Sequence, residues 1–201
     1  TTEGSRVREI RHHVREHLRT IECLEPLFPL IATAAARVTA CLEADGRVFW
    51  VGNGGSAADC QHLSSELVGR FERERRGIAS IALTTDTSAL TAIGNDYGFD
   101  RVFARQVEAI GRPGDLLVGI TTSGNSPNVL RAAEKARALR MTTVGLTGRD
   151  GGALMALADL CLVVPADNTA RIQEAHILIG HILCDLVEAH FATDTADGAP
   201  L

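Results

Sequence analysis

Five short runs of β-branched and apolar residues recur along the chain, each followed by Gly, Ser, Asp or Asn and then by a helical pattern. The predicted strands are Arg47–Val51, Ile78–Thr84, Leu116–Thr121, Thr142–Thr147 and Leu160–Val164. Strands that alternate with helices must cross over to pair in parallel. The order therefore predicts an α/β fold with one open parallel sheet and helices on both of its faces.

Helical patterns also flank this alternating region. Val7–Arg19 and Pro26–Ala44 are predicted helices, so residues 1–46 are expected to form a helical N-terminal extension. Ala170–Phe191 is predicted to be one long helix, and the polar tail 193–201 is expected to fray.

The composition argues against several classes of protein. A chain of 201 residues with 45% hydrophobic content and no composition shift predicts a single domain over 1–201. A net charge of −5 and 4% aromatic residues disfavour nucleic acid as a partner. Five scattered cysteines indicate free thiols in a reducing compartment. Since no eighteen apolar residues run together, we expect a cytoplasmic protein that does not span a membrane.

A glycine-rich turn follows the first predicted strand. Gly52 to Asp59 leaves the strand through three glycines, and Ser56 is predicted to cap the next helix, with Asp59 in a capping-box-like position. Glycines allow close approach of a ligand, and the exposed N–H groups of a first helical turn favour an anion. A tight turn without a ligand is the alternative.

A second polar loop follows the third predicted strand. Four hydroxyl groups lie within six residues, on Thr121, Thr122, Ser123 and Ser126. Ser126 followed by Pro127 predicts a helix N-cap and first helical residue. Ligands of open α/β sheets bind at the carboxyl ends of the strands. We therefore expect this loop to bind a phosphate monoester, the alternative being a merely polar loop.

The same glycines partly match a dinucleotide-binding fingerprint. Gly52-x-Gly54-x-x-Ala57 fits the relaxed pattern, and Asp86 follows the second strand, although about thirty residues on instead of the usual twenty or so. The lysine of a nucleotide P-loop is missing. An NAD-dependent oxidoreductase thus remains an alternative, but it leaves the serine-rich loop unexplained.

Two helices carry groups that can move protons. His62 and Glu66 are four residues apart and share one helical face, while Gln173, Ile177 and His181 form one stripe of the last helix. A solvated glutamate and a hydrogen-bonded core histidine are the ordinary alternatives. A carboxylate and an imidazole beside a phosphate site suffice to move a proton between adjacent sugar carbons. His176 and His190 lie off the stripe, and we expect structural or surface roles for them.

Six motifs between about Arg47 and Phe191 stand in the order and spacing of one known family. They are GNGGSAADCQH, SELVGRF, TAIGNDYGF, TSGNSPNVL, LTGRDGG and RIQEAHILIGH. In these motifs the chain resembles the sedoheptulose 7-phosphate isomerases, or phosphoheptose isomerases, of the sugar-isomerase (SIS) fold. The resemblance implies a single SIS domain with a five-stranded parallel sheet. It also implies a homotetramer whose active sites form between subunits. Thr121 stands where the family usually has Ser and retains the hydroxyl.

The resemblance further implies a role for each matching residue. Glu66 matches the catalytic base, which also contacts the substrate, and His181 matches the catalytic acid. The implied phosphate ligands are Ser56, Thr121, Thr122, Ser123 and Ser126. The implied sugar ligands are Asn53, Gly54, Gly55, Asn95, Asp96 and Gln173.

Some members of the family carry zinc, and the matching ligands here are His62, Glu66, Gln173 and His181. His62 and Glu66 have suitable spacing, and imidazole plus carboxylate suits zinc. Gln173 and His181, however, are about 12 Å apart along a helix. Both reach one ion only if it lies between them, and zinc ligation would compete with the role of Glu66 as a base.

The implied reaction converts D-sedoheptulose 7-phosphate to D-glycero-D-manno-heptose 7-phosphate, the entry to bacterial heptose biosynthesis, whose product serves lipopolysaccharide, a surface-layer glycan or an antibiotic. It needs no nucleotide cofactor. The alternative within the fold is a non-catalytic SIS relative that binds a sugar phosphate or a replication initiator and lacks the catalytic pair. The presence of both Glu66 and His181 favours the enzyme.

Overall fold

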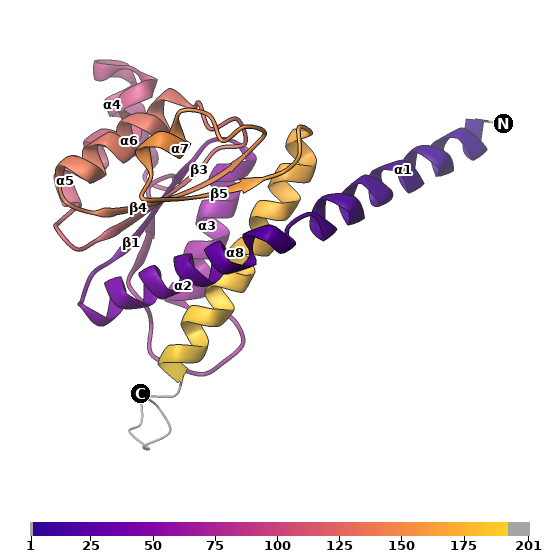
Figure 1. Ribbon diagram of the computed structural model, residues 1–201. Coiled ribbons are helices and arrows are strands. Elements are labelled where there is room, and N and C mark those ends of the chain that lie inside the picture. Colours follow the sequence, from indigo (N-terminus) through magenta and orange to yellow (C-terminus); the bar gives the residue numbers. More distant parts are fainter. Residues whose placement is uncertain (1, 193–201) are drawn as a thin grey trace.

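A parallel five-stranded sheet forms the centre of the protein, for which a computed structural model describes residues 2–192 (Figure 1). The strands are β1 (Val48–Gly52), β2 (Ser80–Ala82), β3 (Leu116–Ile120), β4 (Thr142–Gly148) and β5 (Leu160–Val164). Their order in the sheet is β2-β1-β3-β4-β5, and all four neighbouring pairs are parallel. The α/β class and the parallel sheet predicted from the sequence are therefore confirmed.

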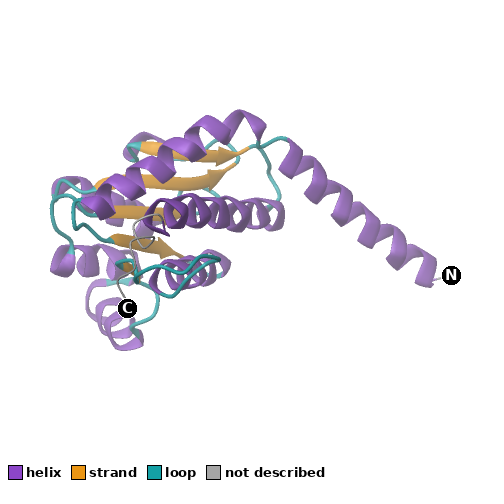
Figure 2. Cartoon of the chain, turned by 90° about the horizontal axis from the view of Figure 1, so that it is seen from below, coloured by secondary structure: helices purple, strands orange, loops and turns teal. Residues whose placement is uncertain are grey.

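Helices cover both faces of the sheet (Figure 2). On one face lie α2 (Phe28–Glu43), α3 (Gly55–Val68) and α8 (Thr169–Ala192). On the other lie α4 (Thr87–Tyr97), α5 (Val102–Ile110), α6 (Pro127–Ala138) and α7 (Leu154–Leu157). The remaining helices are α1 (Thr2–Glu22) and the short 3-10 turns η1 (Glu25–Leu27) and η2 (Phe99–Arg101).

The core consists of two apolar layers that the sheet separates. Successive strand residues point to opposite faces, so Val48 and Trp50 of β1 join the layer under α3 and α8, whereas Phe49 and Val51 join the layer under α5 and α6. All five residues of β1 are buried. Burial on both faces explains why the strands are continuous apolar runs rather than alternating ones.

Several predicted elements differ from the structure at their ends, and the first helix, predicted over Val7–Arg19, extends over Thr2–Glu22. The second strand was predicted over Ile78–Thr84 but is formed only by Ser80–Ala82, because β2 lies at the sheet edge and pairs with β1 alone. Ile78 instead donates its backbone N–H to the carbonyl of Leu67, at the end of α3. The helix predicted to begin at Pro26 begins as the turn η1. The predicted frayed tail lies outside the described residues.

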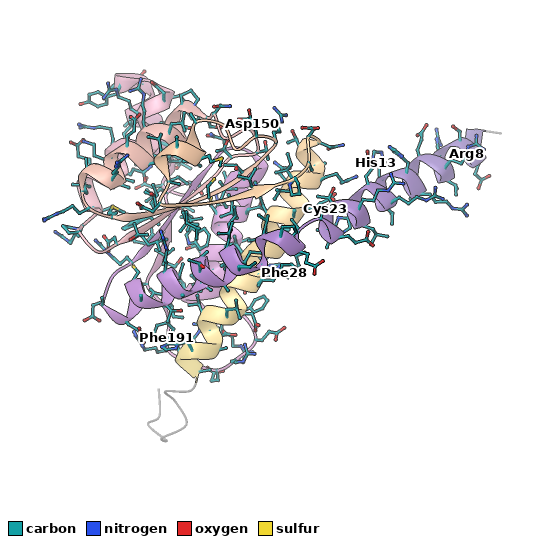
Figure 3. All side chains as sticks on the ribbon, viewed as in Figure 1. Arg8, His13, Cys23, Phe28, Asp150 and Phe191 are labelled. Carbon is teal, nitrogen blue, oxygen red and sulfur yellow. The ribbon has the colours of Figure 1, made fainter. Side chains whose placement is uncertain are left out.

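The helix α1 extends away from the body of the protein (Figures 1 and 3). Its outer part, which carries Arg8 and His13, makes a long arm, and Val7, Ile10 and Val14 on this arm are exposed apolar residues. Its inner end is held on α8, where Nδ1 of His17 lies 2.8 Å from a carboxylate oxygen of Glu174. One chain therefore leaves an apolar helical surface uncovered.

Two segments match a membrane span in length and mean hydropathy, although the sequence lacks a continuous apolar run. Thr169–Ala192, with a mean hydropathy of 1.3, is α8, and 50% of its apolar window is buried. Its apolar side packs on the sheet and on α2 and α3, as in a core helix. The second segment, Glu3–Glu43, is divided by η1, and α2 packs on the same layer.

The five cysteines are free thiols, as predicted. Burial raises the pKa of Cys41 to about 11 and that of Cys184 to about 12, so both remain protonated at neutral pH. These two residues serve as small apolar side chains of the core, whereas Cys23 is exposed.

Candidate active site

The order of the strands reverses direction between β1 and β3. From β1 the chain proceeds to β2 on one side, and from β3 it proceeds to β4 and β5 on the other. Such a switch point leaves a crevice outside the carboxyl ends of the two strands. Gly52 pairs with Ile120 at these ends, so the glycine-rich turn and the serine-rich loop emerge side by side.

The glycine-rich turn enters α3 two residues earlier than predicted. Gly54, at φ +56°, is the N-cap, and the helix begins at Gly55, so the prediction that Ser56 caps the helix is wrong. Only glycine adopts this conformation readily, which lets the chain turn into the helix at once. Ser56 is buried in the first helical turn. The turn also packs on α8, because a Cβ atom on Gly55 would lie 2.5 Å from Nε2 of Gln173.

A pair of asparagines joins the two loops. Nδ2 of Asn53 donates to Oδ1 of Asn128 at 2.8 Å, and Nδ2 of Asn128 donates to Oδ1 of Asn53 at 2.8 Å. Asn128 is 2% exposed and lies in the first turn of α6. The sequence analysis missed Asn128, since the NSPN run gives no signal that this side chain turns back toward β1.

The serine-rich loop contains linked hydroxyl groups. Oγ1 of Thr121 lies 2.8 Å from Oγ of Ser126 and 3.5 Å from Oγ of Ser123, and the latter accepts the N–H of Asn125. Ser126 is the N-cap of α6 and Pro127 its first residue, as predicted. The Ser126 side chain makes no capping bond, so its hydroxyl faces Thr121 and not the helix. Thr122 lies between them in the loop and is half-buried.

The glycine turn after β4, which contains Gly151 and Gly152, packs against the serine-rich loop. Gly124, at φ +68°, lies so close to the backbone of Gly151 that no side chain would fit. The carbonyl of Gly124 accepts the N–H of Leu154 at 2.9 Å. Oδ1 of Asn125 accepts the N–H of Ala153, also at 2.9 Å. The turn after β4 therefore fixes the shape of the loop after β3.

Three side chains from α3 and α8 form one polar cluster, which we call the trio: His62, Glu66 and His181. Nε2 of His62 lies 3.0 Å from Oε1 of Glu66 and 3.3 Å from Nε2 of His181. One ligand atom from each residue lies within 4.8 Å of the others. Glu66 and His181, which the sequence places far apart, therefore belong to one site. Such a cluster can hold a metal ion or exchange protons with a bound molecule.

Packing sets the orientation of the trio. The ring of Phe71 stacks on the ring of His181, with their centroids 5.4 Å apart. The ring of His62 meets the His181 ring edge-on, with a centroid distance of 4.9 Å. Leu63 of α3 packs directly against Gly180 of α8, and a Cβ atom at position 180 would overlap the Leu63 side chain. The Glu66 side chain is 22% exposed and that of His62 is 48% exposed, so the trio is open to solvent in one chain.

The helices α3 and α8 run side by side and meet at two levels near the site. Gly55 meets Gln173 at one level, and His62 meets His181 at the other. Because Gln173 and His181 are eight residues apart, about 12 Å of helix separates them. Gln173 therefore lies with the glycine-rich turn, and within one chain it does not join the trio.

The predicted sugar ligands Asn95 and Asp96 lie in the last turn of α4 and are exposed. Nδ2 of Asn95 donates to Oδ1 of Asp96 at 2.8 Å. At the other end of α4, Asp86 accepts the N–H of Ala89 as the N-cap. The carboxylate required by the dinucleotide alternative is thus a helix cap in this chain.

Two further titratable residues of α3 and α8, Asp59 and His176, were not assigned to the site from the sequence. Asp59 shares the α3 face of Gly55 and Glu66; its Oδ2 is buried without a hydrogen-bond partner among the described residues, and burial raises its pKa. His176 is fully buried, with Nε2 2.9 Å from the carbonyl of Thr147, and burial lowers its pKa to about 4. His176 is therefore a neutral structural residue, which confirms its predicted role.

A family model described as SIS domain matches residues 12–148. This stretch contains the glycine-rich turn, the serine-rich loop, α3 and β1 to β4. The fold and its paired loops are therefore those of an SIS domain.

Closer relatives share nearly the whole chain. A phosphoheptose isomerase from Helicobacter pylori is 56% identical over 169 residues, which are 84% of this chain and 88% of that protein. One from Roseiflexus is 54% identical over 180 residues, 90% of each chain. The structure of a phosphoheptose isomerase from Neisseria gonorrhoeae superimposes with a TM-score of 0.86 at 48% identity, covering 90% of this chain and 98% of that one. The chain belongs to the phosphoheptose isomerase family of SIS-domain proteins.

Proposed function

We propose that the protein is an aldose–ketose isomerase that converts D-sedoheptulose 7-phosphate to D-glycero-D-manno-heptose 7-phosphate. The observation that carries this proposal is the trio, in which a carboxylate and two imidazoles from distant parts of the sequence meet between α3 and α8. The names of the relatives support the same reaction and substrate class.

The chemistry requires a proton to leave C1 of the ketose and a proton to reach C2. Glu66 is the base that removes the C1 proton, and the electron pair forms the C1–C2 double bond of an enediol. The Glu66 carboxyl group then returns a proton to C2 as the double bond is lost. His181 donates a proton to the C2 oxygen as this bond forms and accepts one from the C1 oxygen as the aldehyde forms. His62, 3.0 Å from Glu66, orients the carboxylate toward the substrate.

The phosphate and the sugar hydroxyls bind toward the amino end of α3, away from the trio. The phosphate ligands are Ser56, Thr121, Thr122, Ser123 and Ser126. The sugar ligands are Asn53, Gly54, Gly55, Asn95, Asp96 and Gln173, together with Glu66. Ser56 and Glu66 are ten residues apart on α3, about 15 Å along the helix. An extended heptose 7-phosphate measures roughly 9 Å from C2 to phosphorus at C–C bonds of about 1.5 Å. With side chains at both ends, such a chain spans the crevice.

The trio also fits a zinc ion. Imidazole and carboxylate are preferred zinc ligands, and three of the four expected ligand residues, His62, Glu66 and His181, present atoms within 4.8 Å of one another. The fourth, Gln173, lies nearer the phosphate end. When bound, the ion would polarise the substrate oxygens as a Lewis acid. Glu66 has a second carboxylate oxygen that remains free to accept a proton. No nucleotide cofactor takes part.

We further propose a cytoplasmic homotetramer with active sites at subunit interfaces and no nucleic-acid or membrane partner. The apolar surface of the α1 arm and the solvent-exposed trio both lack cover in a single chain. Association of further copies would bury the arm and complete the active sites. The product would enter heptose biosynthesis, as used for lipopolysaccharide.

Incubation with sedoheptulose 7-phosphate tests the function directly. We expect the heptose 7-phosphate aldose to accumulate, and the rate to fall on treatment with a zinc chelator and recover with added zinc. Product analysis by NMR identifies the aldose. Absence of turnover with and without zinc would refute the isomerase, and unchanged turnover after complete chelation would refute the metal.

A further inference from the structure

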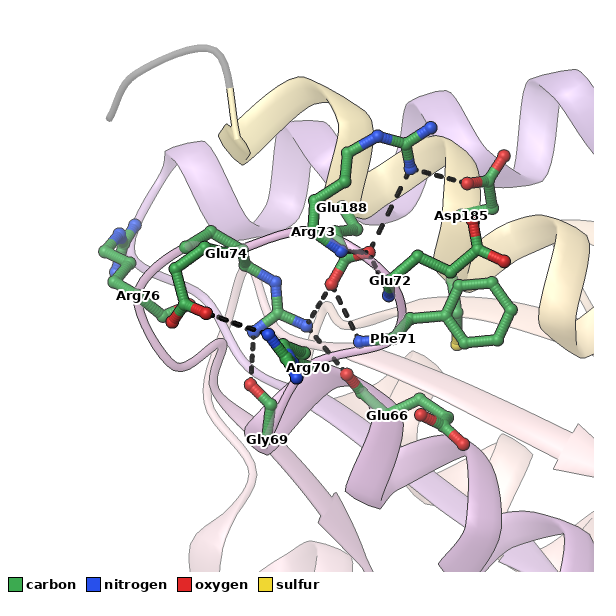
Figure 4. Close-up of polar contacts among 12 residues, drawn as sticks. Glu66, Gly69, Arg70, Phe71, Glu72, Arg73, Glu74, Arg76, Asp185 and Glu188 are labelled. Carbon is green, nitrogen blue, oxygen red and sulfur yellow. Dashed lines mark hydrogen bonds and ion pairs between the residues drawn. The ribbon is translucent and has the colours of Figure 1, made fainter. Parts of the chain in front are cut away.

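A buried ion pair lies directly behind the trio. Glu188 of α8 has a fully buried side chain, and its carboxylate accepts three consecutive backbone N–H groups at 2.7–2.8 Å (Figure 4). These groups belong to Phe71, Glu72 and Arg73, just after the end of α3. Although burial acts to raise the pKa of Glu188, the three backbone hydrogen bonds and the Arg75 charge lower it. The residue is therefore an anion inside the fold.

Arg75 completes the network from the same loop. Its fully buried guanidinium lies 3.2 Å from Oε1 of Glu188. It donates from Nη2 to the carbonyl of Glu66 at 2.7 Å and from Nη1 to the carbonyl of Gly69 at 2.8 Å. Carbonyls in the last turn of a helix lack helical partners, and a cation there is favoured by the helix dipole. Arg75 thus caps the turn of α3 that carries Glu66.

The network reaches the trio at two points. Arg75 binds the backbone of Glu66 itself, and Glu188 binds the backbone of Phe71, whose ring stacks on His181. Glu188 and His181 also lie two turns apart on the same helix. The pair therefore connects the carboxyl end of α3 to α8 at the level where the trio forms.

Stability alone does not account for this arrangement. Removing two charges from water is costly, and apolar residues of similar size are often as good or better in such a place. Nε of Arg75 is also buried without a hydrogen-bond partner among the described residues. What an apolar pair cannot supply is a set of directed bonds that fixes the backbone of Glu66 and of Phe71.

We propose that Arg75 and Glu188 are positioning residues that hold Glu66 and His181 at the separation needed for proton transfer. This inference rests on the proposed roles of Glu66 and His181. A displacement of about 1 Å at a reacting group can cost about 100-fold in rate. The phosphate end of the crevice, about 15 Å away along α3, does not depend on the pair.

The test is the split between kcat and KM in Arg75→Lys. Lysine keeps the charge but cannot reach Glu188 and the helix carbonyls together, because it lacks the planar fork of arginine. We expect kcat for sedoheptulose 7-phosphate to fall about 10- to 100-fold while KM changes by less than about threefold. Glu188→Gln, which keeps the shape and an acceptor for the backbone N–H groups, should show the same pattern and replaces Arg75→Lys if that variant does not fold.

Asp115→Asn is the matched control. Asp115 is a buried carboxylate that accepts the backbone N–H groups of Arg47 and Arg112 and pairs with the Arg47 guanidinium at 2.7 Å, just before β3 begins. Its replacement should lower Tm but leave kcat unchanged.

The variants are assayed at a temperature well below every Tm, with Glu66→Gln in parallel. If Arg75→Lys retains wild-type kcat, or if Asp115→Asn loses kcat in the same proportion to its loss of Tm, the positioning role is overturned. If Glu66→Gln itself retains turnover, the proposed function of the trio fails instead, whatever the Arg75 result.

Discussion

The two parts of the proposed active site, the serine-rich loop and the trio, are built in different ways. The serine-rich loop consists of six consecutive residues, Thr121 to Ser126, and the hydroxyls of Ser123 and Ser126 both lie near that of Thr121. The trio draws its members from α3 and α8, and His62 and His181 are separated by 119 positions in the sequence. One part is thus local structure, whereas the other exists only while two helices pack correctly.

This difference predicts how each part responds to change. Several hydroxyls and backbone groups share the phosphate, so loss of one should weaken binding without stopping the reaction. Each member of the trio has a separate chemical role, so loss of one should stop the reaction without preventing binding. Packing changes between α3 and α8 should affect the trio alone.

The largest effect is expected for Glu66→Gln and His181→Ala. Each removes a proton-transfer group, and such groups typically contribute about 100- to 10,000-fold to the rate. We expect kcat to fall by at least about 100-fold, while calorimetry still detects binding of sedoheptulose 7-phosphate through the intact loop. Near-normal turnover in either variant would remove that residue from the mechanism.

A smaller effect, on binding, is expected for Ser126→Ala. Loss of one hydrogen bond to a charged group costs about 1–3 kcal/mol, which is roughly 5- to 150-fold in KM. Steady-state kinetics should show this rise in KM with kcat nearly unchanged. Thr33→Ala, which removes an exposed hydroxyl bonded to the carbonyl of Pro29 on α2, is the control. An unaltered KM for Ser126→Ala would contradict the assignment of the phosphate site.

Gly180→Ala should push α3 and α8 apart without removing any functional group of the trio. Its new methyl would overlap the buried side chain of Leu63, and such overpacking typically costs about 1–3 kcal/mol. We expect a lower Tm and a kcat reduced by about tenfold, with little change in KM. Gly94→Ala is the matched control, because its methyl would meet only Val102, at 3.8 Å, and should be neutral or stabilising. Equal kcat in both variants would show that the trio tolerates movement of α8.

The smallest effect on the site is expected from His176, which contributes to stability. Its pKa is lowered to about 4, so the folded protein keeps it neutral while the unfolded chain protonates it below about pH 6.5. Its contribution is therefore complete above about pH 6.5 and is lost as the pH falls toward 4. Between pH 7.5 and 5, the wild type should lose about 2 kcal/mol more unfolding free energy than His176→Gln. Denaturant titrations measure this difference, and identical losses would contradict it.

The same contrast explains what the sequence could predict. The strands, the Ser126–Pro127 helix start and the hydroxyl-rich loop depend on neighbouring residues, so local patterns sufficed. The predicted cap at Ser56 was wrong because the backbone conformation of Gly54, not a side chain, starts α3. Asn128, Arg75 and Glu188 were missed because each acts through partners distant in the sequence.

Helical spacing predicted that His62 and Glu66 lie together, but it did not predict the position of Gln173. His62 and Glu66 share a face by their four-residue spacing, and helical spacing placed His181 on one stripe of the last helix. The same stripe contains Gln173, yet the structure places its amide on Gly55, two turns from His181. Periodicity shows which residues share a face of a helix. Which of them meet a given partner depends on how the two helices pack along their length.

The most direct test of the central claim is the reaction in deuterium oxide. An enediol formed by Glu66 acquires its C2 hydrogen through a carboxylate that is open to solvent, so we predict deuterium at C2 of the aldose product. Glu66→Gln should form no labelled aldose under the same conditions. Complete retention of the original C1 hydrogen at C2, or wild-type labelling by Glu66→Gln, would contradict the account.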